Sequence, residues 1–177
     1  GAGDITVDVG AGVAQDAASN NNTAASQVVV TYDATAPTVT ISGAPSIVNN
    51  TTPFTINVDF SESVTGFTAG GVTVGNGTSS NLVGSGSNYT VDITPTGAGD
   101  IALDVNAGVA QDAASNSNTA ASQVVVTYDA TAPTVTISGA PSTVNNTTPF
   151  TINVDFSESV TGFSAGGVTV GNGTSSN

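Results

Sequence analysis

The sequence contains no lysine, arginine, histidine, cysteine, methionine or tryptophan, while 13 Asp and Glu residues give it a net charge of −13. Salt bridges between side chains are therefore excluded, so clustered carboxylates must stay apart, take up protons or bind cations from outside. Nucleic acid and anionic membranes are disfavoured partners because binding them requires Lys and Arg. Without cysteine, disulfide bonds cannot hold the fold together. No signal peptide or membrane span is recognisable.

What the chain does contain is a long internal repeat. Residues 1–81 recur as residues 97–177, a shift of 96, and six of the 81 aligned positions differ. The differing pairs are Thr6/Ala102, Val7/Leu103, Gly10/Asn106, Asn21/Ser117, Ile47/Thr143 and Thr68/Ser164. A period of this length is the size of a whole domain. Enzymes seldom need near-identical sites in tandem, whereas stalks and filaments gain length or valency with each copy, so the repeat favours a mechanical role.

The segment Asp-Ala-Thr-Ala-Pro marks the joint between repeats. Residues 34–129 then form one complete repeat, residues 1–33 the C-terminal part of a preceding repeat, and residues 130–177 the N-terminal part of a following repeat. Half repeats leave strand edges unpaired and are poorly stable alone. We therefore expect the sequence to be a stretch of a longer array. The alternative is that the flanks of neighbouring copies pack together.

The local pattern is all-β, with Val, Ile, Thr, Phe and Tyr alternating with small polar residues between turns rich in Gly, Asn, Ser and Pro. Predicted strands in the complete repeat are Thr38–Ser42, Phe54–Phe60, Ser63–Phe67, Val72–Gly75, Asn81–Gly84, Asn88–Thr94, Asp100–Val105 and Gln123–Tyr128. Seven or eight short strands in each 96-residue repeat predict tandem antiparallel β-sandwiches of the Ig-like type. The period of two predicts these core residues: Val39, Ile41, Phe54, Ile56, Val58, Tyr89, Val91, Ile93, Ile101, Leu103, Val105, Val124, Val126 and Tyr128.

Three segments resemble bacterial Ig-like repeats. They are Thr-Ala-Pro-Thr-Val-Thr-Ile at 35–41, Val-Asp-Phe-Ser-Glu-Ser-Val-Thr-Gly-Phe at 58–67, and Ala-Gly-Val-Ala-Gln-Asp-Ala-Ala-Ser-Asn at 107–116. Such repeats fill the extension regions of giant secreted adhesins and biofilm-associated proteins. The resemblance implies an extracellular rod of tandem sandwiches on a bacterial surface, often stiffened by calcium between domains, with adhesion commonly performed by other domains.

Acidic and amide side chains are expected to gather at the joints. In an Ig-like sandwich the entering linker, the loop after the second strand and the loop between the last two strands lie at one end of the domain. These segments contain Asp33, Asp59, Glu62, Asp112, Asn116 and Asn118. The turn before Asp100 belongs to the opposite end. Asp4 could therefore face this cluster across one joint, and Asp100 could face Asp129, Asp155 and Glu158 across the next.

These residues are candidate ligands for calcium (Ca²⁺), which takes six to eight oxygens in adaptable geometry. The alternative is that they are solvated loop carboxylates that keep the rod soluble. Three further acidic residues, Asp8, Asp92 and Asp104, should point outward from the middle of strands, and we expect them to be solvated.

The expected function is a structural extension repeat of an extracellular adhesin or fibre, whose partners are the neighbouring repeats of the same chain. Asp59 and Glu62 could serve as a carboxylate pair for glycoside hydrolysis. The chain lacks supporting catalytic side chains, however, so we expect no enzyme activity. One alternative is a subunit of a self-assembling filament or sheath that contacts other copies laterally. Another is a ligand-binding module, or a surface that binds ice through threonines such as Thr38, Thr40, Thr55 and Thr90.

Overall fold

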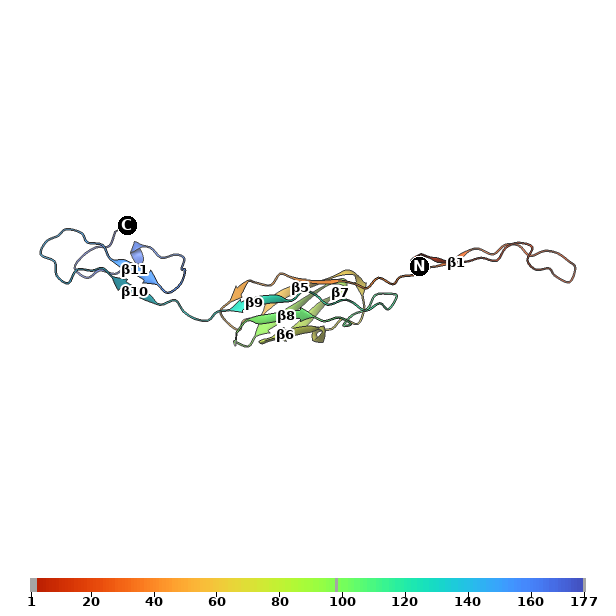
Figure 1. Ribbon diagram of the computed structural model, residues 1–177, viewed down its shortest axis with the longest axis horizontal. Coiled ribbons are helices and arrows are strands. Elements are labelled where there is room, and N and C mark those ends of the chain that lie inside the picture. Colours follow the sequence, from red (N-terminus) through yellow and green to blue (C-terminus); the bar gives the residue numbers. More distant parts are fainter. Residues whose placement is uncertain (1–2, 98, 177) are drawn as a thin grey trace. The chain divides into compact units, whose positions relative to one another are not determined.

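The computed structural model describes residues 3–97 and 99–176, and almost all of its regular structure in this range is β-strand (Figure 1). The chain divides into two compact units, Gly1–Ala130 and Thr131–Asn177. The complete repeat predicted from the sequence lies in the first unit. It is flanked there by the segment up to Asp33, while the second unit holds the start of the next copy.

The complete repeat folds into two sheets. The first has the strand order β3-β5-β7 and the second the order β4-β9-β8-β6. Their bounds are β3 (Val39–Ser42), β4 (Ile47–Val48), β5 (Phe54–Val64), β6 (Val72–Gly75), β7 (Gly77–Pro95), β8 (Ile101–Val105) and β9 (Val124–Tyr128), with the 3-10 helix η1 (Ala69–Gly71) before β6. The pair β4–β9 is parallel, and the other pairs between these strands are antiparallel. The predicted all-β sandwich is confirmed.

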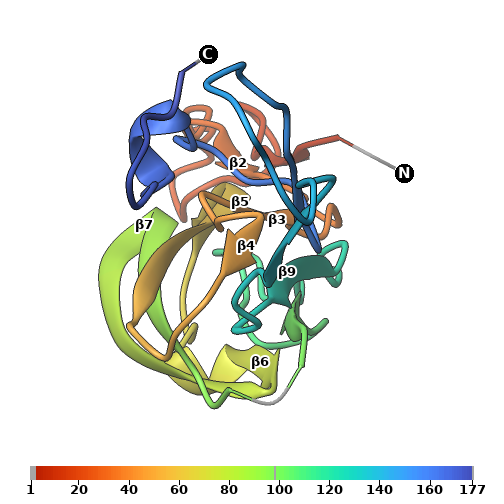
Figure 2. The same ribbon diagram turned by 90° about the vertical axis from the view of Figure 1, so that its left-hand side faces the viewer.

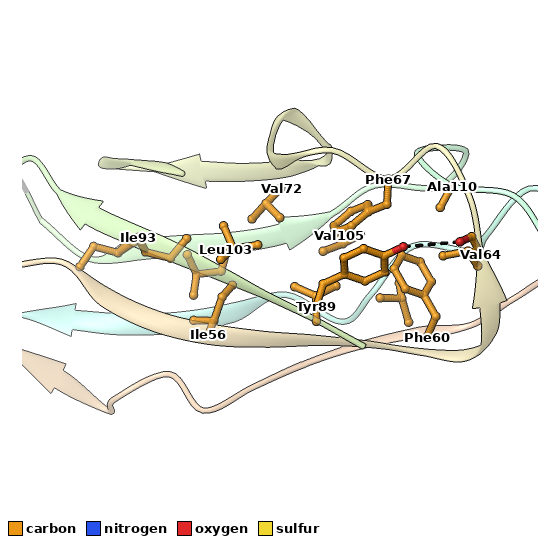
Figure 3. Close-up of a cluster of buried hydrophobic side chains, with 14 of the residues drawn as sticks. Ile56, Phe60, Val64, Phe67, Val72, Tyr89, Ile93, Leu103, Val105 and Ala110 are labelled. Carbon is orange, nitrogen blue, oxygen red and sulfur yellow. Dashed lines mark hydrogen bonds between the residues drawn. The ribbon is translucent and has the colours of Figure 1, made fainter. Parts of the chain in front are cut away.

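The hydrophobic core lies between these sheets (Figure 3). The period-two pattern identified most of it, including Ile56, Leu103 and Val126, which are fully buried. Four predicted members are only partly buried and pack against the core: Ile41, Phe54, Val124 and Tyr128. Five members of the buried hydrophobic cluster were not predicted: Phe60, Val64, Phe67, Val72 and Ala110. The central strands thus follow the pattern, whereas the end of the core near η1 is filled by residues from the last part of β5, from the start of β6 and from two loops.

Three aromatic rings fill that end of the core. Phe67 makes edge contacts with Phe60 and with Tyr89, each at a centroid distance of 5.1 Å. The hydroxyl of Tyr89 donates a hydrogen bond to the carbonyl of Val64 at 3.4 Å, drawn as the dashed line in Figure 3. Edge-to-face rings add to the stabilisation from burial alone. The Tyr89 hydroxyl can be buried because it has this partner.

Strand boundaries differ from the prediction at β5 and β7. The expected break after Phe60 is absent, because a register shift between Asp59 and Val64 lets β5 bend and continue. The segment predicted as two strands is one element, β7, and Figure 2 shows it curving along the sandwich. The amide of Thr96 donates to the carbonyl of Asn76 at 3.0 Å, so the two ends of β7 lie side by side. β7 therefore folds back on itself.

The segment before the complete repeat forms a hairpin of β1 (Ile5–Val7) and β2 (Val28–Val30). Ile5 lies opposite Val30, as Ile101 lies opposite Val126 in the complete repeat. In the complete repeat the counterparts of these strands, β8 and β9, belong to a four-stranded sheet. Here the sheet consists of β1 and β2. The register is nevertheless the same, so it is set locally.

The second unit repeats the start of the sandwich. It contains β10 (Val135–Ser138), β11 (Asn153–Phe156) and the 3-10 helix η2 (Ala165–Gly167). Val135 lies opposite Phe156, as Val39 lies opposite Phe60. Phe156 and Phe163 also keep the edge contact of their counterparts, again at 5.1 Å. The first strand pair of the repeat therefore has the same register in the second unit as in the complete repeat.

Candidate functional site

Three carboxylates from separate segments meet at one end of the complete repeat. Asp33 lies in the linker before β3, Glu62 lies near the end of β5 within the stretch where the register shifts, and Asp112 lies in the loop between β8 and β9. One carboxylate oxygen from each lies within 4.8 Å of the others. We call this group the joint triad. Asp112 is buried and the other two residues are partly buried.

The loop around Asp112 is organised by that side chain. Its Oδ1 accepts hydrogen bonds from the backbone amides of Ala114 and Asn116, both at 2.8 Å, and its Oδ2 accepts one from the Asn116 side chain at 2.9 Å. Burial disfavours the charged carboxylate, but the hydrogen bonds from Asn116 and the nearby amides outweigh it and lower the pKa of Asp112. This carboxylate is therefore held in its charged form.

The same loop forms in the half repeat at the start of the chain. Asp16 accepts from the amides of Ala18 and Asn20, at 2.8 and 2.9 Å, and from the Asn20 side chain at 2.9 Å. These hydrogen bonds lower the pKa of Asp16. Asp16 is exposed, and its loop has the same hydrogen bonds as the loop around the buried Asp112.

The pKa of Glu62 is shifted in the opposite direction, above its ordinary value. Burial is the largest cause that raises its pKa, and the negative charges of Asp112 and Asp33 raise it further. No side chain of the sequence can supply a compensating positive charge. The joint triad is consequently a place where a proton or an external cation relieves repulsion.

The linker is bound to the domain that it enters. The side-chain amide of Asn116 donates to the backbone carbonyl of Asp33 at 3.1 Å. Further along, Pro37 is buried, and its carbonyl accepts from the amide of Thr119 at 2.9 Å. The hydroxyl of Ser61 accepts from the amide of Thr38 at 3.0 Å. Loop and linker are thus held by bonds that involve no ion.

Asn116 lies beside the joint triad, at the end of the domain where the sequence placed it. Its side-chain nitrogen donates to the linker. The linker contacts of Ser61 and Thr119 were missed by the sequence analysis. Both are small polar residues that also occur throughout the strands, so their type carried no signal for this role.

Two predicted ligands have other roles. Asn118 is buried, and its Oδ1 accepts from the amides of Val109 and Ala110, both at 2.9 Å. Its side-chain nitrogen donates to two loop carbonyls, of Asn106 and Thr119. Asp59 lies in β5 on the face away from the core, where its Oδ1 accepts from the Asn88 side chain at 2.8 Å. The structure does not bring either residue into the joint triad.

The remaining candidates lie elsewhere. The Oδ1 of Asp100 accepts from the amide of Tyr128 at 3.3 Å, at the end of the sandwich opposite the joint triad. Asp4 is exposed just before β1, and Asp129 follows β9, where its amide donates to Val48. Asp155 in β11 and Glu158 belong to the second unit. The predicted groupings of Asp4 with the triad, and of Asp100 and Asp129 with these two residues, stay predictions.

A family model for the bacterial Ig-like domain matches residues 33–128 and again residues 129–177. These two matches together cover most of the chain, and they coincide with the sandwich and with the start of the next copy. The protein is thus built of tandem β-sandwich repeats, and the chain belongs to the bacterial Ig-like domain family. The resemblance seen in the sequence is confirmed. Comparisons with curated proteins and with solved structures gave no match.

Family membership constrains location and activity only broadly. Bacterial Ig-like domains commonly stand on the cell surface or outside the cell, and they are typically not enzymes. Among the described residues, no helix has the length and apolar character needed to cross a membrane.

Proposed function

We propose that this chain is part of the extension region of an extracellular bacterial adhesin or fibre, in which each repeat adds one sandwich to a stalk and performs no catalysis. The observation that carries the proposal is the bound linker. Asn116 holds the backbone of Asp33, and Thr119 holds that of Pro37. A linker that is hydrogen-bonded to the domain it enters limits bending between successive sandwiches, which is what a stalk requires.

We propose further that calcium binds the joint triad and stiffens the joint. The three carboxylates come from the linker, from β5 and from the β8–β9 loop, so one ion bound to all of them would connect three segments. Carboxylate oxygens suit calcium, and extracellular modules bind it with dissociation constants of roughly 0.1 to 1 mM. Binding would also remove the repulsion that raises the pKa of Glu62.

The test compares the protein in millimolar calcium and in chelator by small-angle scattering and thermal melting. We expect chelation to reduce the maximum dimension and to lower the melting temperature of the complete repeat. Glu62→Gln should weaken both responses because it removes one ligand charge. Asp59→Asn is the matched control: it removes a carboxylate of the same strand that lies outside the joint triad, and it should respond to calcium as the unmodified protein does.

If neither quantity changes on chelation, calcium does not stiffen the joint. A stalk would then rely on the direct hydrogen bonds of the linker alone. To test these bonds separately, the maximum dimension of Asn116→Ala in chelator is compared with that of the unmodified protein. If this variant is as extended as the unmodified protein, the bound linker does not limit bending and the stalk proposal loses its main support.

The threonine surface considered as an ice-binding alternative is interrupted. Thr40 lies opposite Asp59, Thr55 opposite Asp92, and Thr90 opposite Asn57. The hydroxyl of Thr55 donates to Asp92 at 2.7 Å. Because each of these threonines faces an acid or an amide across the sheet, no uniform row of hydroxyls forms there, and the stalk remains the function that the geometry supports best.

A further inference from the structure

We propose that the loop between β4 and β5, residues 49–53, is the site at which the complete repeat is N-glycosylated. This inference depends neither on the stalk function nor on calcium. It rests on how the fold holds each Asn-X-Thr sequence, or sequon, of the repeat. A transferase must reach both the Asn carboxamide and the Thr two positions later, so an acceptor belongs on an accessible surface loop.

The complete repeat contains four sequons, which begin at Asn49, Asn50, Asn76 and Asn88. The first two overlap in the sequence Asn-Asn-Thr-Thr at 49–52. The third begins immediately before β7 and the fourth lies inside this strand. Sequence alone gives these four equal standing, whereas the structure separates the overlapping pair from the others.

The sequon of Asn88 is part of a sheet. The side-chain nitrogen of Asn88 donates to Oδ1 of Asp59 at 2.8 Å, across the pair β5–β7. Tyr89, the middle residue of the sequon, is buried in the core. Thr90 lies opposite Asn57 in the same strand pair. A transferase would have to detach β7 from β5 before it could bind this segment.

The sequon of Asn76 is held at the turn between β6 and β7. Its side-chain nitrogen donates to the carbonyl of Asp100 at 2.7 Å, just before β8. Its backbone carbonyl accepts from the amide of Thr96 at 3.0 Å. Gly77 and Thr78 then belong to β7. The carboxamide of Asn76 therefore connects two segments of the sandwich, and binding by a transferase would break that connection.

The loop 49–53 has neither restraint. All of its residues are exposed and lie outside the strands. The side-chain nitrogen of Asn50 donates to Oδ1 of Asn49 at 2.9 Å, and Oδ1 of Asn50 accepts from the amide of Thr52 at 2.8 Å. Both bonds stay within the loop, and the second brings the carboxamide close to the residue that completes its sequon. A transferase can thus bind here without disturbing the core.

The two ends of the loop are fixed by the sandwich. On one side, the carbonyl of Val48 accepts from the amide of Asp129 at 2.9 Å. On the other, Phe54 lies opposite Ile93 and packs against the core. The folded repeat therefore presents this loop at its surface between two anchored residues.

The transfer is a substitution at the anomeric carbon of a nucleoside diphosphate sugar. The carboxamide nitrogen bonds to this carbon while the bond from the carbon to the diphosphate oxygen breaks. The nitrogen loses one proton to a base of the transferase, and the nucleoside diphosphate leaves. Because Asn49 and Asn50 are adjacent, a sugar on one covers the segment that the transferase needs for the other. We therefore expect one sugar on each loop.

The test treats the folded whole chain with uridine diphosphate glucose and a purified transferase that recognises Asn-X-Thr. The enzyme is chosen because it modifies synthetic peptides of residues 74–80 and 86–92, so that it accepts the sequons of Asn76 and Asn88 when they are unfolded. After digestion in denaturant, mass spectrometry should find one hexose on the segment 49–53. It should find none at Asn76 or Asn88. Protein purified from the cells that make it should carry its sugar on the same segment.

The variant with Thr51→Val and Thr52→Val lacks both sequons of the loop and should lose the modification there. The variant with Thr51→Ser and Thr52→Ser is the matched control, because Asn-X-Ser is also a sequon, and it should keep the modification. The proposal is overturned if the loop of the folded chain takes no hexose, or if Asn76 or Asn88 takes as much as the loop does. It is also overturned if the Val variant is still modified on this segment, or if the protein from its own cells carries no sugar there.

Discussion

At the scale of single residues, the loop between β8 and β9 depends on two buried polar side chains. Asp112 and Asn118 are the buried polar residues of the described chain, and no buried side-chain nitrogen or oxygen in that part lacks a partner. Burying polar groups is tolerable when their hydrogen bonds are complete. Asp112 shapes the turn that presents the joint triad, and Asn118 closes the base of the loop.

Replacement of Asn118 tests this arrangement. Asn118→Ala leaves the buried amides of Val109 and Ala110 without acceptors, so we expect the complete repeat to lose on the order of 2 to 3 kcal/mol of unfolding free energy. Chemical denaturation measures the loss. Asn22→Ala, the counterpart in the exposed half repeat, is the control and should leave this transition unchanged. Equal effects of the two variants would contradict the role assigned to burial.

The dependence of stability on pH follows from Glu62 and Asp112. Because the pKa of Glu62 is raised above its ordinary value of 4.5, the folded protein holds this proton more tightly than the unfolded chain does. In chelator, stability should therefore rise as the pH falls from neutral through the raised pKa toward 4.5. The lowered pKa of Asp112 acts in the opposite sense, so stability should be lost below its ordinary value of 3.8.

Thermal melting of Glu62→Gln across this pH range checks the assignment. The variant should melt at a higher temperature than the unmodified protein at neutral pH in chelator, and it should show no rise on mild acidification. Glu158→Gln, at the matching position of the second unit, should change neither property of the complete repeat. If the melting temperature of Glu62→Gln still rises on mild acidification as that of the unmodified protein does, another group causes the rise.

How far the joint could be predicted depends on which way each side chain points. Asp33, Glu62 and Asp112 could be assigned to one end of the sandwich because the order of strands places their segments there. Asp59 was assigned with them since the pattern ended the strand at Phe60. The strand in fact continues, and between the buried Val58 and Phe60 the pleat turns Asp59 to the outer face.

At the scale of elements, β5 and β7 show where sequence periodicity was insufficient. The alternation correctly placed Ile56, Val91 and Ile93 in the core. It could not show that β5 passes through a bulge or that β7 folds back, because both depend on pairing with other segments. The same holds for β4, a two-residue strand whose parallel partner β9 lies far along the chain.

The fold-back in β7 requires glycine at position 84. Gly84 has a φ of +128°, and a Cβ there would collide with the carbonyl oxygen of Asn88. We expect Gly84→Ala to destabilise the complete repeat by on the order of 2 to 4 kcal/mol, as measured by denaturation. Gly66→Ala is the control, because its φ is +81° but nothing lies within 4 Å of the added Cβ. It should cost about 1 to 2 kcal/mol from backbone strain alone. Similar losses for both would mean that the collision is relieved.

At the scale of the whole molecule, complete and half repeats differ in the protection of their aromatic residues. Trypsin has no site, because the chain lacks Lys and Arg. Chymotrypsin should cut first after the exposed Tyr32, Phe150 and Phe163. Phe60, Phe67 and Tyr89 are buried in the complete repeat and should be cut only after it unfolds.

A time course followed by mass spectrometry checks this order in dilute protein. The expected early product retains residues 34–129 intact. Urea at a concentration that unfolds the complete repeat is the control and should make these six of the nine Phe and Tyr sites equally susceptible. Early cleavage after Phe60 or Phe67 without urea would contradict the burial of that core.

The parallel pair β4–β9 has a consequence when a stalk is pulled. The chain enters the sandwich at one end and leaves at the other, with β4 near its start and β9 at its exit. Tension would therefore slide these strands lengthwise past one another. The hydrogen bonds from Thr127 to Ser46 and from Asp129 to Val48 would be loaded together, in shear, and would not open one after the other as in a zipper. A two-residue strand that adds little to the core would thus act as a mechanical clamp in the complete repeat.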